Sequence, residues 1–337
     1  MSNPSSTRSW CIVGAGAIGC ALAGRLTLAR HDVTLVARGD KVTELRHAGL
    51  TMLEGDQTSH ARPRIAHIEE LGPQDRLILA VKGQHLPDLL PGLANLIDRR
   101  TTLVPMMNGI PWWYFMAEGG AHDGSTIESV DPGGKLKALL PADQIIGCVV
   151  FTGARTEGIG KVRIVGRQHV VLGELTAKLN TDIDTLAAEF NDAGILAAIT
   201  DRIRDHVWTK AAMNLATNPL SVISGAPAGE HFGNPQLYAI VKSILDECWA
   251  AGRLYGAKPT MSEADLLALG ASPAAYRHRT SMQLDYAQGK ALELSSIYDG
   301  IEELARRVGL RLPVGSTIAE LARYLALTHR KDEHARG

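Results

Sequence analysis

The sequence lacks the features that mark several large classes of protein. None of its apolar runs reaches the length of about 18 residues that a membrane-spanning helix needs, so we expect no span. Its formal net charge is −1 with acidic and basic residues interspersed, which indicates neither a nucleic-acid partner nor an anionic membrane surface. The opening stretch, MSNPSSTRSW, holds no apolar segment, so we expect no signal peptide and a cytoplasmic protein.

Cysteine is scarce as well. The four cysteines, Cys11, Cys20, Cys148 and Cys248, form no CxxC pair and show no spacing typical of metal ligands. We therefore expect buried free thiols in a reducing compartment, rather than disulfides or zinc, and no metal site. The remaining composition, with 45% apolar and 21% charged residues, is typical of a globular protein.

A glycine-rich turn follows the first apolar run, in SWCIVGAGAIGCALAGRL. Gly14, Gly16 and Gly19 match GxGxxG, and DVTLVAR at 32–38 supplies the second strand of a βαβ unit of about 30 residues. Such glycines permit the turn, the approach of a pyrophosphate and close helix–strand packing. The pattern predicts a dinucleotide held at the helix start, although a glycine turn without a ligand is the alternative. The predicted cofactor-binding turn comprises Gly14, Ala15, Gly16, Ala17, Ile18 and Gly19.

The end of the second strand indicates which nicotinamide dinucleotide binds. NAD-binding proteins place Asp or Glu there, to accept hydrogen bonds from the ribose 2′-hydroxyl. Here Arg38 follows the strand, whereas Asp32 lies too early and Asp40 lies beyond Arg38. A guanidinium group suits a 2′-phosphate, so the pattern favours NADPH. Two alternatives stay open: Arg38 is a solvated side chain, or Asp40 binds the ribose.

Two further apolar runs predict buried parallel strands. RLILAVKGQHL at 76–86 is expected to end at Lys82, and TTLVPMMNGI at 101–110 is expected to end at Asn108-Gly109. Because ligands of open α/β sheets lie outside the carboxyl ends of the strands, we expect Lys82 and Asn108 to face the cofactor.

The pattern changes along the rest of the chain. Residues 111–134 are irregular and include the aromatic run Trp112–Phe115, which suits a core or an interface better than a pocket wall. Residues 144–174 predict an antiparallel extension of the sheet, in which His169 is structural. A helix over 179–194 and a strand over 195–200 follow, and almost everything afterwards is helical.

These patterns predict an α/β protein of two domains, as its length also suggests. We expect an N-terminal Rossmann-type dinucleotide-binding domain over residues 1–200, followed by an all-helical C-terminal domain over 201–337 with a cleft between them. Helices expected over 234–308 have apolar faces that suit either a core or the interface of a homodimer.

One helix of the second domain carries an unusual polar face. In VWTKAAMNLATNPLSVISG, at 207–225, Lys210, Asn214 and Asn218 recur every four residues and share one side of an otherwise apolar helix. Pro219 is expected to kink the helix. A lysine ammonium can protonate the oxygen of a ketone that receives hydride, and the amides can hold polar groups of the substrate. We interpret this face as a substrate site; a solvent-facing polar face is the alternative.

Several motifs together resemble those of the ketopantoate reductase (2-dehydropantoate 2-reductase) family over roughly residues 10–325. They are GAGAIG, Arg38, Lys82, NG at 108–109, KAAMNLATNPLS, and RTSMQLD…ALELS at 279–295. Family members reduce ketopantoate to D-pantoate with NADPH, on the route to pantothenate. The resemblance implies that Lys210 is the general acid and Glu293 the acidic catalytic residue. It also implies that Asn214, Asn218 and Ser281 bind the substrate, and that Arg38, Lys82 and Asn108 lie on the cofactor side.

The chain departs from the family pattern at three places. It has Glu293-Leu294-Ser295 where Glu-x-Asp is common, and Pro313-Val314-Gly315 where Pro-x-Asn often follows. The segment 111–134 is also longer and more aromatic than the loop expected in a minimal member. We therefore hypothesise a bulkier or more apolar 2-oxo acid, with Trp112–Phe115 as the segment to examine. A β-hydroxyacid dehydrogenase is a second reading, although MNGIPWW and HVWTKAAMN fit its motifs poorly. A non-catalytic NADP-binding protein is the third.

Overall fold

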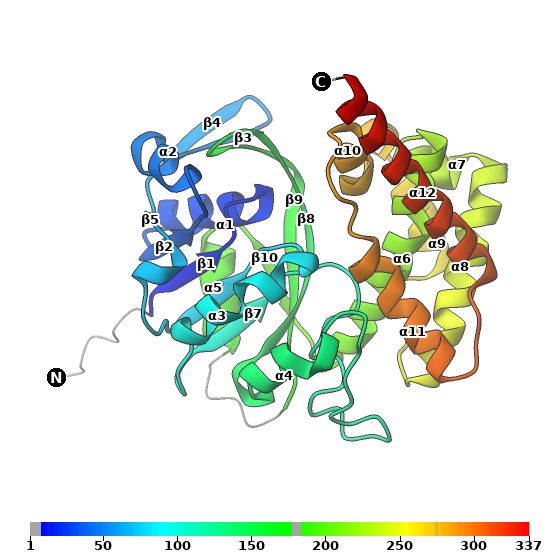
Figure 1. The fold of residues 1–337 in the computed structure, drawn as a ribbon, viewed down its shortest axis with the longest axis horizontal. Helices are drawn as coiled ribbons and strands as arrows, with labels where there is room; N and C mark the ends of the chain where they lie inside the picture. Colours follow the sequence, from blue (N-terminus) through cyan, green and yellow to red (C-terminus); the bar gives the residue numbers. More distant parts are fainter. Residues whose placement is uncertain (1–7, 177–182, 274, 337) are drawn as a thin grey trace. The chain divides into compact units, whose positions relative to one another are not determined.

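The computed structural model describes residues 8–176, 183–273 and 275–336 (Figure 1). The described chain forms two compact units. The first comprises residues up to 107, 115–125 and 135–203, and the second comprises 108–114, 126–134 and the residues from 204 onward. The predicted domain boundary at residue 200 stays a prediction, because two short segments before it also belong to the helical unit.

A parallel sheet forms the centre of the first unit, with its strands in the order β5-β2-β1-β6-β7. The strands are β1 (Trp10–Val13), β2 (Val33–Val36), β5 (Arg64–Ala66), β6 (Arg76–Leu79) and β7 (Thr102–Pro105). Every residue of these five strands is buried except Arg64, the first residue of β5, as expected for strands that are covered on both faces. This sheet and the helical second unit confirm the predicted fold class.

Two of these strands are shorter than predicted. Strand β6 ends at Leu79, and the chain then turns into a 3₁₀ helix over Gly83–His85, which Lys82 directly precedes. Strand β7 ends at Pro105, which has no N–H to donate to a neighbouring strand. Lys82 and Asn108 therefore lie in the loops that follow the strands, rather than at the strand ends themselves.

A second sheet holds the antiparallel strands. Strands β8 (Ile146–Gly158) and β9 (Lys161–Glu174) pair antiparallel, as predicted, and His169 stacks on Phe151 within this pair. Strand β9 also pairs with β10 (Leu196–Ile199) and with β3 (Leu50–Glu54), and β3 pairs with β4 (Gln57–Ala61), which gives the order β10-β9-β3-β4. An isolated parallel bridge joins Leu103 of β7 to Ile145, the residue before β8, and the predicted extension of the parallel sheet stays a prediction. The β3–β4 hairpin was missed in the sequence, because LTMLEGDQTSHA is short and half polar.

Helix α1 (Ala17–Leu28) packs against strands of both sheets (Figure 1). Gly24 permits this packing, because a Cβ there would lie 2.4 Å from the Sδ atom of Met52 in β3. The other helices of this unit are α2 (Lys41–Ala48), α3 (Leu86–Leu96), α4 (Lys135–Leu139) and α5 (Ile183–Asp192). Helix α5 accounts for the described part of the helix predicted over 179–194. All four cysteines are buried and free, as predicted.

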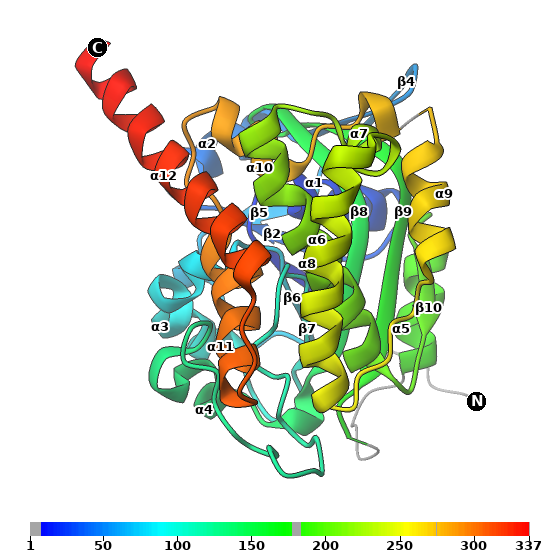
Figure 2. The same cartoon turned by 90° about the vertical axis from the view of Figure 1, so that its right-hand side faces the viewer.

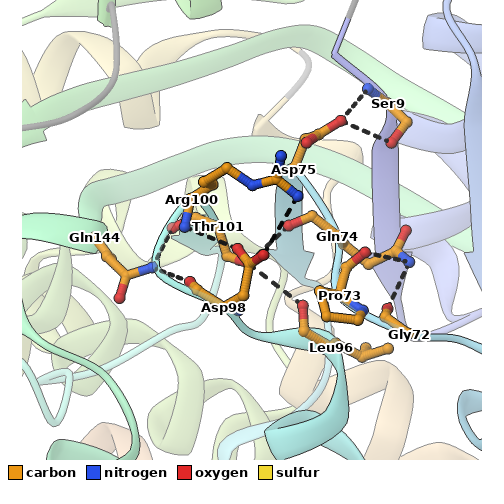
Figure 3. A network of polar contacts seen from close by, with 10 residues as sticks. All are labelled: Ser9, Gly72, Pro73, Gln74, Asp75, Leu96, Asp98, Arg100, Thr101 and Gln144. Carbon is orange, nitrogen blue, oxygen red and sulfur yellow. Dashed lines mark hydrogen bonds and ion pairs between the residues drawn. The ribbon is translucent and has the colours of Figure 1, made fainter.

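A polar network joins the loops at the amino ends of the parallel strands (Figure 3). The side chain of Gln144 donates to the carbonyls of Asp98 and Thr101, at 2.6 and 2.7 Å. The Thr101 hydroxyl donates to the carbonyl of Gln74, at 2.7 Å. These contacts satisfy the buried loop groups at this edge of the sheet. The glycine-rich turn lies at the opposite, carboxyl edge.

Helices make up most of the second unit (Figure 2). They are α6 (Ile203–Ser224), α7 (Ala228–Gly233), α8 (Pro235–Leu254), α9 (Glu263–Ala271), α10 (Ser281–Ala287), a π-helix over Ser295–Asp299, α11 (Gly300–Arg307) and α12 (Pro313–Arg336). Helix α8 contacts both α11 and α12. Its Glu247 caps α12, accepting from the backbone N–H groups of Val314 and Gly315 at 2.9 and 3.0 Å. Among the described helices, none is both long enough and apolar enough to cross a membrane.

A buried carboxylate fixes the loop segment 126–134 to α11. Glu303 accepts hydrogen bonds from the backbone N–H groups of Glu128 and Ser129, at 3.1 and 2.7 Å, and pairs with Arg307. Burial alone would raise the pKa of Glu303, but the hydrogen bonds from Ser129 and Glu128 and the charge of Arg307 lower it below its usual value.

We expect Glu303→Gln to lower the free energy of unfolding by about 1–3 kcal/mol at neutral pH, because the substitution removes a charged acceptor from two N–H groups. The pKa of Glu303 is lower in the folded protein than in the unfolded chain. Its stabilisation is therefore fully present above the unfolded-state pKa of about 4.3, and it is lost as the pH falls through the folded-state pKa. Urea titrations at several pH values check this. The difference between wild type and variant should shrink on acidification, and a constant difference would contradict the assignment.

Candidate active site

The glycine-rich turn connects β1 to α1 and leaves the start of the helix open. Gly16 occupies the N-cap position, where it offers no capping side chain, and Ala17 begins the helix. The first N–H groups of a helix have no partner within the helix. The turn therefore presents backbone donors at the positive end of α1, which is the arrangement that binds a pyrophosphate.

The three glycines serve different purposes. Gly14 has φ +119°, and a Cβ there would lie 2.6 Å from the carbonyl oxygen of Ala80. A Cβ on Gly19 would lie 1.9 Å from the carbonyl oxygen of Gly14. At Gly16, by contrast, a Cβ would meet no atom within 4 Å. The turn itself therefore requires Gly14 and Gly19, whereas the space beside Gly16 is open.

Charged side chains follow β2 beside this turn. Arg38, Asp40 and Lys41 are exposed, and their side chains form no hydrogen bond or ion pair within the described chain. Of these three residues, Lys41 lines a cavity of about 220 Å³, together with Ala15, Cys20, Leu45 and the tip of the β8–β9 hairpin. Burial raises the pKa of the Cys20 thiol to about 12 despite the nearby Lys41 ammonium, so the thiol is unreactive.

Lys82 and Asn108 belong to different units. Lys82 is half-buried in the loop between β6 and α3, in the unit that holds the glycine-rich turn. Asn108 is half-buried too, but it belongs to the helical unit. Their assignment to the cofactor side therefore stays a prediction.

Helix α6 carries the predicted polar face on a single stripe. Lys210 and Asn214 are half-buried, whereas their apolar neighbours Ala211, Ala212 and Leu215 are at most 1% exposed. Between residues 206 and 217 the half-buried positions are His206, Lys210, Met213, Asn214 and Thr217, which share one side of the helix. Asn218 is 6% exposed and lies at the buried margin of this stripe. The helix continues through Pro219 to Ser224, and the kink stays a prediction.

A buried contact places the start of α10 beside the carboxyl half of α6. The hydroxyls of Ser221 and Thr280 are 2.6 Å apart, and the Ser221 hydroxyl also donates to the carbonyl of Asn218. Thr280 caps α10 by accepting from the N–H of Gln283. Ser281, the first residue of α10, is exposed. The structure thus brings Ser281 and Asn218 into one neighbourhood, although 63 residues separate them.

Glu293 lies next to an unusual helical turn. It is half-buried and precedes the π-helix Ser295–Asp299, a conformation that is rare and frequent at functional sites. Gly109 approaches this turn so closely that a Cβ on it would lie 1.7 Å from the carbonyl oxygen of Ser296. The contact brings the Asn108 segment beside the Glu293 segment. In the sequence, the Asn108-Gly109 dipeptide was the only signal for this contact with the π-helix.

The aromatic run is part of the core. Each of Trp112, Trp113, Tyr114 and Phe115 is 1% exposed. The indole N–H of Trp208, on α6, donates to the Tyr114 hydroxyl at 2.6 Å. This confirms the core interpretation and leaves no exposed aromatic surface there for a bulky substrate.

Comparisons with known proteins agree with this arrangement. Residues 10–177 match the family described as ketopantoate reductase PanE/ApbA, and residues 202–326 match its C-terminal part. A 2-dehydropantoate 2-reductase of Mesorhizobium japonicum is 33% identical over 94% of this chain and 97% of its own. A 2-dehydropantoate 2-reductase of Pyrococcus horikoshii is 26% identical over 90% of this chain and 92% of its own.

Solved structures show the same fold. A candidate ketopantoate reductase from Ralstonia solanacearum MolK2 superposes with a TM-score of 0.87 at 32% identity, covering 96% of this chain and 99% of its own. D-mandelate dehydrogenase, solved with NADH and anilino(oxo)acetate, superposes with a TM-score of 0.82 at 21% identity, covering 95% and 99%. The chain therefore belongs to the ketopantoate reductase family and is a nicotinamide dinucleotide-dependent oxidoreductase that acts on CH–OH groups.

Proposed function

We propose that the chain reduces a 2-oxo acid to the 2-hydroxy acid with NADPH, and that the acid is ketopantoate, giving D-pantoate for pantothenate biosynthesis. The observation that carries this proposal is the polar stripe of α6. It leaves one lysine and one amide, Lys210 and Asn214, partly accessible beside apolar neighbours of α6 that are buried. The names of the full-length relatives support the same substrate.

A nicotinamide dinucleotide held over the glycine-rich turn would supply the hydride for the carbonyl carbon. The residues of the helical unit then stabilise the negative charge that develops on the carbonyl oxygen and bind the rest of the substrate. The Lys210 ammonium stabilises that oxygen and transfers a proton to it. Asn214 and Asn218 orient the substrate through amide donors and acceptors, and Ser281 donates to its carboxylate. Glu293 accepts from a substrate hydroxyl or orients Lys210.

A panel of 2-oxo acids tests the substrate. The purified protein should reduce ketopantoate with a higher kcat/KM than pyruvate, a branched 2-oxo acid or an aryl 2-oxo acid. A preference for an aryl acid would support a second candidate, suggested by the fold shared with D-mandelate dehydrogenase and by Ser295 in place of the common aspartate. Turnover of 3-hydroxy acids alone would contradict both candidates and favour a β-hydroxyacid dehydrogenase.

NADPH is proposed as the cofactor because Arg38, after β2, and Lys41, the first residue of α2 (Lys41–Ala48), are exposed cations that form no ion pair among the described residues. Arg38→Ala should weaken NADPH binding about 10-fold or more, or about 1.4 kcal/mol, and leave NADH binding unchanged. Asp40→Asn should change neither. Fluorescence titration of both dinucleotides checks this. Loss of NADH affinity in Asp40→Asn would instead show that Asp40 binds the ribose and that NADH is the cofactor.

We also propose a homodimer in the cytoplasm. A Staphylococcus aureus ketopantoate reductase of the same fold is dimeric. On α12, three large side chains face solvent at intervals of three residues: Leu321, Tyr324 and Leu327, at 47, 65 and 55% exposure. Sedimentation should show a dimer that Tyr324→Glu dissociates, because the substitution adds charge to an apolar contact. A monomer at micromolar concentration would contradict this.

A further inference from the structure

Gly109 occupies a backbone position that no other residue fits. Its φ is +84°, in the left-handed region that favours glycine, and the side of its Cα where a side chain would attach faces the backbone of Ser296. A Cβ there would lie 1.7 Å from the carbonyl oxygen of Ser296, 2.4 Å from its carbon and 3.2 Å from the nitrogen of Ile297. The obstacle is backbone, so no side-chain rotation relieves it.

A second glycine extends this contact. Gly300 follows the π-helix, and a Cβ there would lie 3.3 Å from Ile110 and from Val130. Ile110 is 1% exposed, so the residue after Gly109 is locked into the core of the helical unit. The loop that carries Asn108 is therefore held at two successive points against the segment Ser295–Gly300.

Two candidate site residues flank the contact. Asn108 is adjacent to Gly109 along the chain, at the fixed spacing of about 3.8 Å between neighbouring Cα atoms. Glu293 lies one helical turn before the contact, because its carbonyl accepts from the N–H of Ile297 at 3.1 Å. Both residues are half-buried. Their relative position is thus set by the backbone of two segments that are 187 residues apart, Gly109 and Ser296.

We propose that Gly109 is a positioning residue, whose contact with the Ser296 carbonyl fixes Asn108 beside Glu293 so that the amide and the carboxylate act on one 2-oxo acid. This rests on the proposed function. The pair offers N–H donors for the carbonyl or carboxylate of the acid and an acceptor for a hydroxyl. Neither segment alone sets the distance between these groups.

A matched pair of substitutions isolates the contact. Gly133 lies in the same unit at φ +70°, and a Cβ there would meet no atom within 4 Å. Gly109→Ala and Gly133→Ala therefore share the cost of a positive φ, but only the first displaces the Ser296 segment. We expect Gly109→Ala to lower kcat/KM for the 2-oxo acid about 100-fold, and Gly133→Ala to lower it less than about 3-fold. Equal effects would overturn the proposal.

A double-mutant cycle separates positioning from a general loss of structure. Asn108→Ala and Glu293→Gln, alone and combined, should be non-additive by about 10-fold or more in kcat/KM, and the coupling should vanish in the Gly109→Ala background. Additive effects in the wild-type background would overturn the proposal even if Gly109→Ala fails to fold. If the wild type reduces no acid of the panel, the proposed function has failed. The same cycle, measured on the dissociation constant of oxamate, a non-reducible 2-oxo acid analogue, then tests the positioning alone.

Discussion

Replacing Lys210 with alanine is expected to lower kcat for 2-oxo acid reduction about 1,000-fold while the dissociation constant of NADPH stays unchanged. Lys210 is the cation of the half-buried stripe of α6, in the helical unit, whereas the glycine-rich turn belongs to the other unit. Removing the ammonium leaves the developing oxyanion without its proton donor and does not touch the glycine turn. Steady-state rates and fluorescence titration measure the two quantities separately.

Lys242→Ala is the control for this substitution. Lys242 also lies on a helix of the second unit, but it is exposed and pairs with Asp246 at 3.2 Å. Its loss should leave kcat within about 2-fold, because an exposed ion pair contributes little. If Lys210→Ala retained full turnover, Lys210 would not be the general acid. Tight NADPH binding without turnover in the wild type would instead indicate a non-catalytic NADP-binding protein.

Gly16→Ala is expected to weaken dinucleotide binding about 100-fold, or about 2.7 kcal/mol, without destabilising the fold. The backbone of Gly16 has φ −89°, which any residue adopts, and its Cβ would enter open space. In the folded protein nothing is displaced, and the unfolded chain loses freedom, so the melting temperature should stay constant or rise. In the bound state the methyl group would occupy the space that the pyrophosphate needs.

Two other glycines give the matched comparisons. Gly72→Ala also adds a methyl group in open space, but it lies far along the chain from the glycine turn, and it should leave binding unchanged. Gly19→Ala places a Cβ 1.9 Å from the Gly14 carbonyl oxygen and should unfold the turn, which lowers the melting temperature. Calorimetry and dinucleotide titration distinguish the three variants. Unchanged affinity in Gly16→Ala would mean that the cofactor does not pass over this turn.

Local patterns predicted much of the fold. The glycine turn between β1 and α1 and the apolar strands of the parallel sheet all have signals within about 30 residues. The lengths of β6 and β7 were overestimated, because hydrophobicity continues past the residues that end the hydrogen bonding. Within the second sheet the β8–β9 pair was predicted, but the pairing of β9 with β3 was not, because residues paired there, such as Thr51 and Lys161, are 110 positions apart. Such pairing leaves no periodic signal in either partner.

For the candidate site too, features within one helix were visible in the sequence, whereas contacts between distant segments were not. The spacing of Lys210, Asn214 and Asn218 was visible in the sequence, since one helix sets it. The proximity of Ser281 to Asn218 depends on the Ser221–Thr280 hydrogen bond, which joins two helices. The Gly109–Ser296 contact depends on backbone approach, which side-chain patterns do not report. The burial of the aromatic run agrees with the core interpretation, and the hydrogen bond from Trp208 to Tyr114 that fixes it joins two segments far apart in the sequence.

The product of a single turnover tests most directly whether the protein is a 2-oxo acid reductase. Enzyme saturated with NADPH is mixed with ketopantoate, the loss of absorbance at the nicotinamide band is followed, and the product is resolved by chiral chromatography. We predict one equivalent of D-pantoate for each NADPH oxidised, in wild type but not in Lys210→Ala on the same timescale. NADPH that stays reduced in the presence of ketopantoate and every other 2-oxo acid would contradict the assignment of this protein as a 2-oxo acid reductase.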